Sequence, residues 1–528
     1  MKLERTKNAG KGMAFEILKN FNGIILSFIS RTAMIYCLGI EYTGLGGLFT
    51  SILNVLNLAE LGVGTAMIYS MYKPIAEDDE VKLCALINLY RKYLRIIGGV
   101  ILGLGLYLMP FLDKLISGSV PDDINIYILF LMNLSVTVCS YWLFAYKTCI
   151  LLAHQKNYVT ERIDVVLNLI FSVLQILTLI TLKNYYAYFG LELVRQVCSN
   201  LIKAYAAKKR YPQYKAKGTL DKSEEKGIRK KVKDIFTSRI GEVITGYADT
   251  IVISAFLGLT LLAQYQNYFY IFTAVTGVVG VIYNSTRAGI GNSLVTESKS
   301  KNMRDINIFT LLIFWISTVC VSGFICLYQP FIKVWVHKEN MLPFEIVMCL
   351  SVMFIVQQYR RVLETYRVAG GSWHYDRFRP LIAGLVNLAL NLIMIQYIGL
   401  YGVVLSTIIS EVVVSIPWVI VNVYKNVFEA SAKNFVLFTL KCTLISAVIM
   451  TLLCITSVKL PIDGLLSITF IKLPFDGIPV IVVRLIIGFV VSNIIYLVLF
   501  FKTDEFKGCI SWQKNSFLDK KIIIGRNK

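Results

Sequence analysis

The chain has few charged residues for its length. Only 16% of its 528 residues are Asp, Glu, Lys or Arg, and 56% are hydrophobic, whereas soluble domains carry about 25% and 45–50% of these classes. The mean hydropathy of +0.63 points the same way. This shortage of charge excludes a water-soluble enzyme and a disordered chain, and it predicts a polytopic membrane protein.

Histidine is scarce, and paired cysteines and nucleotide-binding motifs are absent. The 3 histidines and 11 cysteines form no CxxC and no Cys/His cluster, so neither a zinc site nor a disulfide framework is expected. The sequence has no P-loop and no acidic motif near a basic groove, which leaves no site for ATP hydrolysis or nucleotide-sugar transfer. We therefore expect no catalytic set and no resident cofactor.

Apolar runs of spanning length are abundant. A membrane helix needs about 20 mainly apolar residues, and the sequence offers fourteen such runs. No cleavage site follows the first run, so we expect it to remain as a helix. The runs lie near residues 14–37, 44–71, 93–112, 124–146, 163–182, 185–205, 235–258, 261–286, 306–328, 344–366, 379–398, 401–424, 434–457 and 478–501.

Basic residues are unevenly distributed among the connecting segments. With the N terminus inside, 41 of the 54 Lys and Arg fall in inner segments and six in outer ones. This asymmetry predicts an even number of spans with both termini cytoplasmic. Eleven basic residues lie in the loop 208–233, which we expect to be a solvated hinge beside anionic membrane lipids. Because the excess charge sits between apolar runs, no nucleic acid partner is expected.

A weak internal echo indicates two halves. Arg31–Ile35 in the first run has a counterpart in Asp249–Ile253 of the seventh, and transporters are often built from repeats. The predicted plan is an N-terminal six-helix lobe at 1–207, the basic cytoplasmic linker at 208–233, and a C-terminal six-helix lobe at 234–428. Two additional helices and a basic cytoplasmic tail follow at 429–528.

Polar side chains inside the predicted spans are the candidate functional residues. A formal charge at mid-membrane costs about 2.5–3.5 kcal/mol, so each must be paired, hydrated or useful. The candidates are Arg31 in the first span, Asn57 and Glu60 in the second, Arg239, Glu242 and Asp249 on one face of the seventh, and Asn284 with Arg287 at the inner end of the eighth.

Arg31 and Arg239 predict a polar cavity that attracts anions. A guanidinium group suits phosphate because its planar fork gives bidentate, charge-assisted hydrogen bonds and keeps its proton. The alternative is that Arg31 pairs with Glu60, and Arg239 with Glu242, as internal structural bridges. Glu60 and Asp249 have a second interpretation, as carboxylates that bind Na⁺ or a proton to drive transport.

Two other patterns predict packing and interfacial contacts. One face at the inner end of the tenth span carries four polar residues, which we expect to extend toward lipid headgroups, with Arg361 beside them. They are Gln357, Arg360, Glu364 and Arg367. On the third span, Gly99 and Gly103 are expected to let two helices approach closely.

Several stretches resemble a known family. They are Ser30–Tyr36 (SRTAMIY), Leu45–Leu53, Leu58–Ala66 and Met71–Pro74 in the first half, and Asp249–Phe269 in the second. These stretches are similar to bacterial Wzx-type flippases of lipid-linked polysaccharide repeat units, in the multidrug/oligosaccharidyl-lipid/polysaccharide (MOP) exporter superfamily. The resemblance implies an all-α, MATE-like integral membrane fold. That fold would have fourteen transmembrane helices, in two six-helix lobes plus two C-terminal helices.

The resemblance also implies a function. Such a protein moves an undecaprenyl-diphosphate-linked oligosaccharide from the cytoplasmic to the outer leaflet of the bacterial cell membrane by alternating access, without nucleotide. Arg31, Arg239 and Arg287 would meet the diphosphate, while Glu60, Glu242 and Asp249 would pair charges or couple Na⁺ or H⁺. Asn57 and Asn284 would shape the site. A polysaccharide polymerase is an implied partner.

Rival functions remain open from the sequence. A cation-coupled multidrug antiporter of the same superfamily usually has twelve helices and an acidic cavity, and the two extra helices and the basic candidates disfavour it. A membrane enzyme of polysaccharide assembly would need a sizeable outer loop, which the short predicted outer connections do not supply. A scaffold would leave the polar faces packed and dry.

Overall fold

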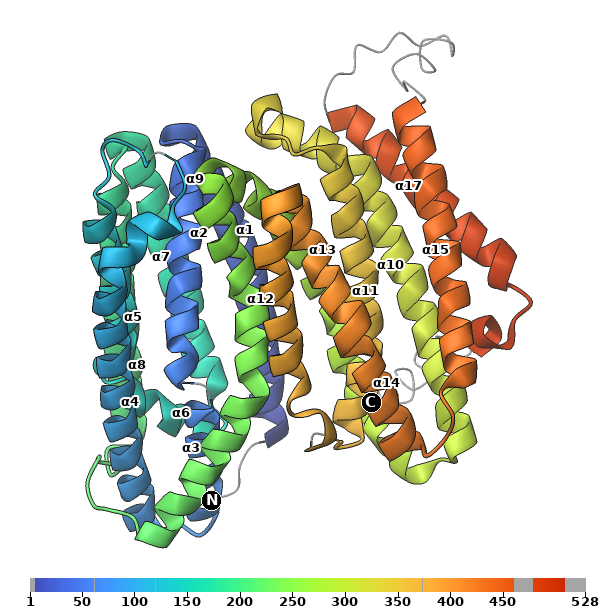
Figure 1. Ribbon diagram of the computed structural model, residues 1–528. Coiled ribbons are helices and arrows are strands. Elements are labelled where there is room, and N and C mark those ends of the chain that lie inside the picture. The colour runs from blue at the N-terminus through green and yellow to red at the C-terminus, as the bar shows by residue number, and fades with distance from the viewer. Residues whose placement is uncertain (1–4, 61, 119, 373, 460–477, 509–528) are drawn as a thin grey trace, which may run out of the picture. The chain divides into compact units, whose positions relative to one another are not determined.

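Every regular element that the structure describes is a helix. The computed structural model describes residues 5–60, 62–118, 120–372, 374–459 and 478–508, and no strand occurs in these ranges (Figure 1). The chain divides into two compact units, Met1–Gln266 and Asn267–Lys528.

In its described residues, the first unit contains eight helices, three short 3₁₀ turns and the first part of a ninth helix. The elements are α1 (Arg5–Cys37), α2 (Ile40–Leu56), η1 (Asn57–Glu60), α3 (Val63–Ala76), α4 (Glu80–Leu108), η2 (Met109–Leu115), α5 (Ile126–Trp142), η3 (Ala145–Lys147), α6 (Thr148–Ala153), α7 (Asn157–Leu182), α8 (Tyr185–Arg210) and α9 (Lys222–Thr296), which continues into the second unit.

The second unit begins within α9. Its further elements are α10 (Lys299–Val336), η4 (Lys338–Asn340), α11 (Phe344–Ala369), η5 (His374–Asp376), α12 (Arg379–Ile398), α13 (Leu400–Ser410), η6 (Glu411–Ser415), α14 (Ile416–Val423), η7 (Tyr424–Phe428), α15 (Lys433–Lys459) and α17 (Ile478–Phe500). The two π-helical segments η6 and η7 continue α13 and α14 without a loop.

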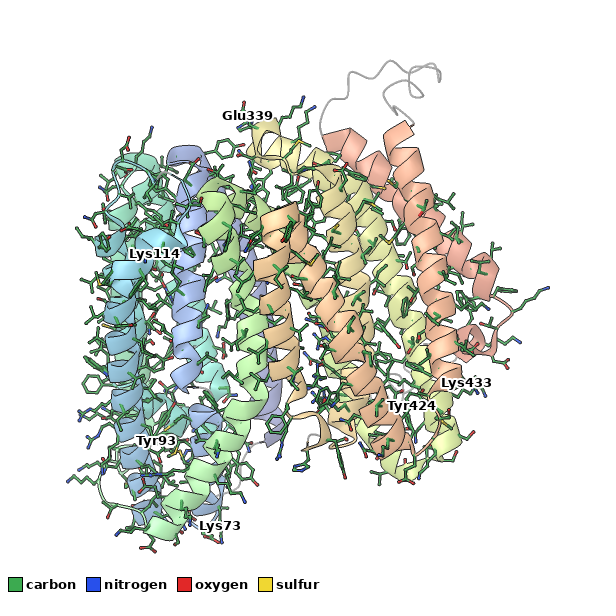
Figure 2. All side chains as sticks on the ribbon, in the orientation of Figure 1. Lys73, Tyr93, Lys114, Glu339, Tyr424 and Lys433 are labelled. Atoms are coloured by element: carbon green, nitrogen blue, oxygen red, sulfur yellow. The ribbon has the colours of Figure 1, made fainter. Side chains whose placement is uncertain are left out.

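The helices are those of a multi-pass membrane protein. Eight described helices are long and apolar enough to cross a membrane. The number is nine if α5 and the following segment Ala145–Ala153, which are bent by 43° relative to each other, count as one span. Each of the fourteen predicted runs falls on a helix or a chain of helices. The number of crossings stays a prediction. In Figure 2, Lys73 and Lys114 lie toward opposite ends of the first unit, as expected for an inner and an outer loop.

One predicted span is interrupted. The run 44–71 forms α2, the 3₁₀ turn η1 and α3. Gly62 caps α3 with a φ of +86°, a left-handed conformation that glycine adopts without a Cβ penalty. A Cβ there would lie 2.7 Å from Cβ of Ile235 on α9, so a glycine at this break also allows α3 and α9 to pack closely.

The predicted division between the seventh and eighth spans is confirmed. Gly258 has a φ of +86° and separates two helical parts of α9. The backbone N–H of Ser117 donates to the Ser254 carbonyl at 2.9 Å, and the Ser254 hydroxyl donates to the Leu115 carbonyl at 2.8 Å. The kink is therefore held by the segment after η2.

Glycine packing in the first unit differs from the expectation. A Cβ on Gly99 or Gly103 would meet no atom within 4 Å, so their predicted role in close packing is wrong. The α4 glycines that face neighbours are Gly98, against the Trp142 indole, and Gly105, where a Cβ would lie 2.6 Å from Leu134. The sequence places four glycines within eight residues, and the spacing alone does not tell which face is covered.

In the second unit, α10 contacts α11, α15 and α17 (Figure 1). Three buried hydroxyls join these helices, because Thr318 Oγ1 lies 2.8 Å from Ser446 Oγ and 3.1 Å from Tyr496 Oη. Ser446 and Tyr496 are 2.9 Å apart. The two C-terminal helices therefore pack onto α10 through hydrogen bonds as well as apolar contacts. The predicted domain limits within this region remain predictions.

The central basic segment is docked on the first unit. Tyr211 is buried and its ring packs against His154, with the centroids 4.2 Å apart and the ring planes tilted by 32°. The amide of Asn88 donates to the Gly218 carbonyl at 2.8 Å. The lysines at 208, 209, 215 and 217 remain exposed. The segment is thus a solvated surface anchored by aromatic contacts rather than a free hinge.

Candidate functional site

A cavity of about 230 Å³ lies between α9 and α11 in the second unit. Two of its lining residues, Asn284 and Arg287, were predicted from the sequence as substrate ligands. The remaining lining residues are Gly280, Tyr283, Arg361, Glu364, Thr365, Arg367 and Val368.

Helical periodicity explains why these residues share one cavity. On α9 the lining residues fall at 280, 283, 284 and 287, and on α11 they fall at 361, 364, 365, 367 and 368. Residues three, four and seven apart lie on one face of a helix. Tyr283 joins the two faces, since its hydroxyl donates to the Gln358 carbonyl at 3.0 Å.

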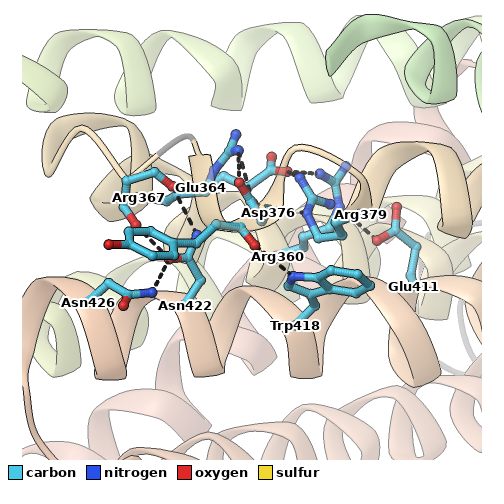
Figure 3. Close-up of polar contacts among 11 residues, drawn as sticks. Arg360, Glu364, Arg367, Asp376, Arg379, Glu411, Trp418, Asn422 and Asn426 are labelled. Atoms are coloured by element: carbon cyan, nitrogen blue, oxygen red, sulfur yellow. Dashed lines mark hydrogen bonds and ion pairs between the residues drawn. The ribbon is translucent and has the colours of Figure 1, made fainter. Parts of the chain in front are cut away.

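Ion pairs fix the arginine side chains on one side of the cavity (Figure 3). Arg360 contacts the Glu364 carboxylate one turn along α11, and its Nε lies 2.7 Å from Glu411 at the start of η6. Arg379, at the N terminus of α12, reaches the same Glu364 oxygen at 2.7 Å. These pairs tie three elements of the unit together around Glu364.

A second buried carboxylate completes the network. Asp376 of η5 has no exposed side-chain surface, and Nη1 of Arg367 lies 2.8 and 2.9 Å from its two oxygens. Nε of Arg379 lies 3.3 Å from Asp376 Oδ2. Figure 3 shows Arg367 and Arg379 converging on Asp376. The short turn before α12 therefore supplies the anion that holds both guanidinium groups.

The expected extension of this face toward lipid headgroups is wrong for the charged residues of α11. The side chains of Arg360, Glu364 and Arg367 are only 20%, 21% and 12% exposed. They are held in ion pairs within the unit. Sequence spacing correctly predicted that these α11 residues share one helix face. Their acidic partners on η5 and η6 belong to other elements, so the ion pairs depend on the tertiary structure.

Positive charge exceeds negative charge around the cavity. Arg287 is exposed and Arg361 is half-buried, and neither has a hydrogen bond or ion pair with the described residues. Nη1 of Arg361 would lie 3.9 Å from a Cβ on Gly280. The guanidinium groups of the network and the cavity number five, and the carboxylates Glu364, Asp376 and Glu411 number three.

Arg31 is placed in the first unit. Its side chain is half-buried on α1, and Nη2 donates to the Ala263 carbonyl of α9 at 3.3 Å. Close packing surrounds this contact, because a Cβ on Gly44 of α2 would collide with the Leu259 carbonyl. A Cβ on Gly47 would collide with the Gln266 amide. Arg31 thus bridges α1 to the start of the eighth predicted span.

The structure does not pair Arg31 with Glu60. The Tyr141 hydroxyl of α5 donates to Glu60 Oε2 at 2.8 Å and lies 3.3 Å from Asn57 Oδ1. No ion pair of Glu60 is found within the part of the chain that the structure describes. Asn57 and Glu60 are therefore brought together at η1 by a tyrosine, which the sequence pattern did not indicate.

The stripe on the seventh predicted span is helical, as expected. Glu242 is exposed and Asp249 is half-buried on α9. The side chain of Arg239 lies outside the described residues, so neither its place in a cavity nor its pairing with Glu242 is tested.

Another charged cluster in the first unit escaped the sequence prediction. Asp164 of α7 lies 2.6 Å from Lys203 Nζ on α8 and 3.6 Å from Lys19 Nζ on α1. Lys19 also reaches Glu161 at 2.8 Å. Glu161 and Asp164 are three residues apart on one helix face, a visible signal, but both lysine partners come from other helices.

Comparison with known proteins identifies the fold. No family model and no curated protein matches the chain. The lipid II flippase MurJ, in an inward closed conformation, superposes with a TM-score of 0.63 at 17% identity, over 92% of this chain and 99% of MurJ. An inward-facing MATE family multidrug resistance transporter of the MOP superfamily gives 0.58 at 13% identity, over 76% of this chain and 94% of that one.

A variant of the Vibrio cholerae MATE transporter VcmN gives a TM-score of 0.51 at 12% identity, over 81% of this chain and 100% of VcmN. These similar structures are transporters and flippases rather than enzymes. The protein therefore has the all-α, multi-pass membrane fold that these MurJ and MATE transporter structures share.

Proposed function

We propose that this protein is a flippase for a lipid-diphosphate-linked oligosaccharide repeat unit. It moves the unit from the cytoplasmic to the outer leaflet of the bacterial cell membrane by alternating access, for export of a surface polysaccharide. The observation that carries the proposal is the cavity of the second unit, where Asn284 and Arg287 meet Arg361 and Arg367 with more guanidinium groups than carboxylates.

The chemistry of the cargo explains why arginine is needed. A diphosphate group cannot enter hydrocarbon without replacing its water shell, and guanidinium groups supply charge-assisted hydrogen bonds in its place. Arg31 and Arg239 of the first unit are also proposed as ligands of a diphosphate. Amide side chains such as Asn57 and Asn284 can donate to and accept from sugar hydroxyls.

The carboxylates are proposed to couple transport to an ion gradient. Glu60, Glu242 and Asp249 lie on or beside membrane-spanning helices, where a carboxylate is retained when it pairs with a charge or takes Na⁺ or H⁺. The fold similarity to a lipid II flippase supports a lipid-linked cargo. The exposed lysines of the linker are proposed to contact anionic lipids.

A second candidate function is a cation-coupled multidrug antiporter. The structural similarity to MATE transporters favours it. The excess of guanidinium groups around the described cavity disfavours it for cationic drugs, because like charges in a cavity of low dielectric repel. A membrane enzyme of polysaccharide assembly receives less support, since the similar structures are transporters.

The test is flipping in proteoliposomes. An undecaprenyl-diphosphate-linked oligosaccharide with a fluorescent sugar is bleached by external dithionite, so movement between leaflets is measured as the bleached fraction. Wild-type protein is expected to raise that fraction above the protein-free level. Arg31→Ala and Arg31→Glu are expected to abolish the gain, and Arg31→Lys to keep part of it, because lysine retains the charge without the planar fork.

Arg304→Gln is the matched control, since Arg304 is exposed on α10 and lines neither this cavity nor the contacts of Arg31. Normal flipping by membrane-inserted Arg31→Ala and Arg31→Glu proteins would show that the diphosphate role of Arg31 is wrong. Efflux of cationic drugs without any lipid movement would favour the antiporter instead.

A further inference from the structure

We infer that Arg361 of α11, together with Arg287 of α9, forms the oxyanion subsite of the second unit and determines its preference for a diphosphate. The inference rests on the proposed function and extends it, because the sequence pattern gave Arg361 no role in binding cargo. Both residues line one cavity of about 230 Å³.

Arg361 differs from the arginines around it. Arg360, Arg367 and Arg379 each make ion pairs of 2.7–3.3 Å with carboxylates of the same unit. Arg361 is half-buried, and no hydrogen bond or ion pair of its guanidinium is found within the described ranges. A guanidinium charge that is partly removed from water and makes no ion pair can bind an anion that enters the cavity, whereas the paired arginines have their donors occupied.

The neighbouring residue provides an internal comparison. Arg360 and Arg361 have the same side chain and adjacent positions, but they point about 100° apart around α11, as any two consecutive helical residues do. Arg360 meets Glu364 and Glu411. Arg361 lies beside Gly280 on α9 instead, where a Cβ would be in ordinary contact with its Nη1 at 3.9 Å and a larger side chain would enter its space. One arginine is structural and the next is open to the cavity.

The ion-pair network positions the subsite. Glu364 also lines the cavity and would repel an anion if its charge were unbalanced. Arg360 and Arg379 both form ion pairs with the Glu364 carboxylate, so their positive charges largely cancel its negative potential in the cavity. Asp376 in turn holds Arg367 and Arg379. Arg361 and Arg287 are thus the two guanidinium groups of the cavity for which no ion pair is found within the described residues.

The geometry favours a group with adjacent phosphates. Each guanidinium presents a planar fork of N–H donors, and two forks from facing helices match two linked phosphates better than one. The volume of about 230 Å³ exceeds several-fold the ~30 Å³ share of a water molecule in the liquid, so a hydrated oxyanion fits. A polyprenyl diphosphate, a phospholipid headgroup and free pyrophosphate share this chemistry.

The experiment measures binding of farnesyl diphosphate to the full-length protein in nanodiscs. Arg361→Gln is expected to raise Kd at least tenfold, which corresponds to about 1.4 kcal/mol. Arg361→Lys is expected to give an intermediate value. Gly280→Leu is expected to match Arg361→Gln, because it fills the space beneath Arg361 while every charge is kept. The control Arg304→Gln is expected to stay within twofold of wild type.

Thermal unfolding of each variant checks that it is folded, and Gly280→Leu keeps the test valid if Arg361→Gln is unstable.

Competition then identifies the source of the phosphate. Farnesyl diphosphate should be displaced poorly by farnesyl phosphate, by inorganic pyrophosphate and by phosphatidylglycerol. Equal competition by phosphatidylglycerol would overturn the inference in favour of a headgroup site, and equal binding of pyrophosphate alone would overturn it in favour of a free-anion site.

Failure of this inference and failure of the proposed function give different results. If Arg361→Gln and Gly280→Leu bind farnesyl diphosphate like wild type while Arg31→Ala loses flipping, the subsite is wrong and the flippase function stands. If wild-type protein neither binds farnesyl diphosphate nor moves the lipid-linked oligosaccharide, the proposed function is wrong, and the subsite falls with it.

Discussion

The Tyr141 hydroxyl of α5 donates a 2.8 Å hydrogen bond to Glu60 at the point where the second predicted span is interrupted. The same hydroxyl lies 3.3 Å from Asn57 Oδ1, so one tyrosine contacts both polar residues of η1. A 3₁₀ turn lacks the full set of α-helical hydrogen bonds. The tyrosine therefore holds the broken segment against α5.

Removal of this hydroxyl is expected to destabilise the first unit. In Tyr141→Phe the half-buried Glu60 carboxylate loses its donor, and a hydrogen bond to a charged group contributes about 1.5–3 kcal/mol. Thermal unfolding in detergent should show a lower midpoint. Tyr107→Phe is the control, because the Tyr107 side chain is exposed on α4 and its hydroxyl makes no hydrogen bond with the described residues. Equal midpoints for both variants would contradict the prediction.

Asp376 is expected to be the most sensitive carboxylate of the second unit. Asp376→Ala leaves Arg367 and Arg379 without a shared buried partner, and breaking a buried pair in this way costs about 3–5 kcal/mol. We expect poor insertion or a large fall in the unfolding midpoint. Asp122→Ala, at an exposed loop position, should change little. A stable Asp376→Ala protein would mean that the network is not structural.

The helices were predictable because their physical signals are local. An apolar run of about 20 residues followed by a break marks a membrane helix, and the Lys183–Asn184 break separates α7 from α8 as expected. Lys183 has a φ of +48°, and the Asn184 side chain accepts from the Ala187 N–H at 2.9 Å. The interruption at η1 was missed, since the run 44–71 is mainly apolar and contains no proline.

The site was only partly predictable because ion pairs depend on contacts between elements. Spacing gave Asn284 and Arg287 on one face of α9, and the cavity confirms that they lie together. Spacing could not show that Glu411 and Asp376 form ion pairs with Arg360 and Arg367, whereas neither carboxylate forms an ion pair with Arg361. That distinction needs the position of η5 and η6, which no local pattern encodes.

Close packing of α2 on α9 gives a further prediction. A Cβ on Gly44 would collide with the backbone carbonyl of Leu259, which cannot move as a side chain can. Gly44→Ala is expected to destabilise the first unit by about 1–3 kcal/mol. Gly103→Ala should be neutral or stabilising, because nothing lies within 4 Å and alanine favours a helix interior. Unfolding midpoints that fall in the reverse order would refute this packing.

Docking of the central linker is expected to depend on pH through His154. Burial lowers the pKa of His154 below its usual 6.5, and Lys156 acts in the same direction. Nδ1 lies 2.8 Å from the Ile150 carbonyl, while the buried Nε2 has no hydrogen-bond partner among the described groups. The neutral ring packed against Tyr211 is therefore the folded form, and a proton on Nε2 would be buried without an acceptor.

The sign of the effect follows from this shift. A lowered folded pKa means that the unfolded state binds more protons, so the stabilisation is complete above pH 6.5 and is lost as the pH falls below that value. Protection factors of the backbone amides of residues 211–218, which correct for the slower intrinsic exchange at lower pH, should fall between pH 7.5 and about pH 5.5 in wild type. His154→Phe should keep the ring contact and remove the dependence, whereas His374→Gln, at an exposed residue of η5, should leave it in place. Protection factors that do not change with pH in the wild type would show that the linker is held by contacts other than the one between the His154 and Tyr211 rings.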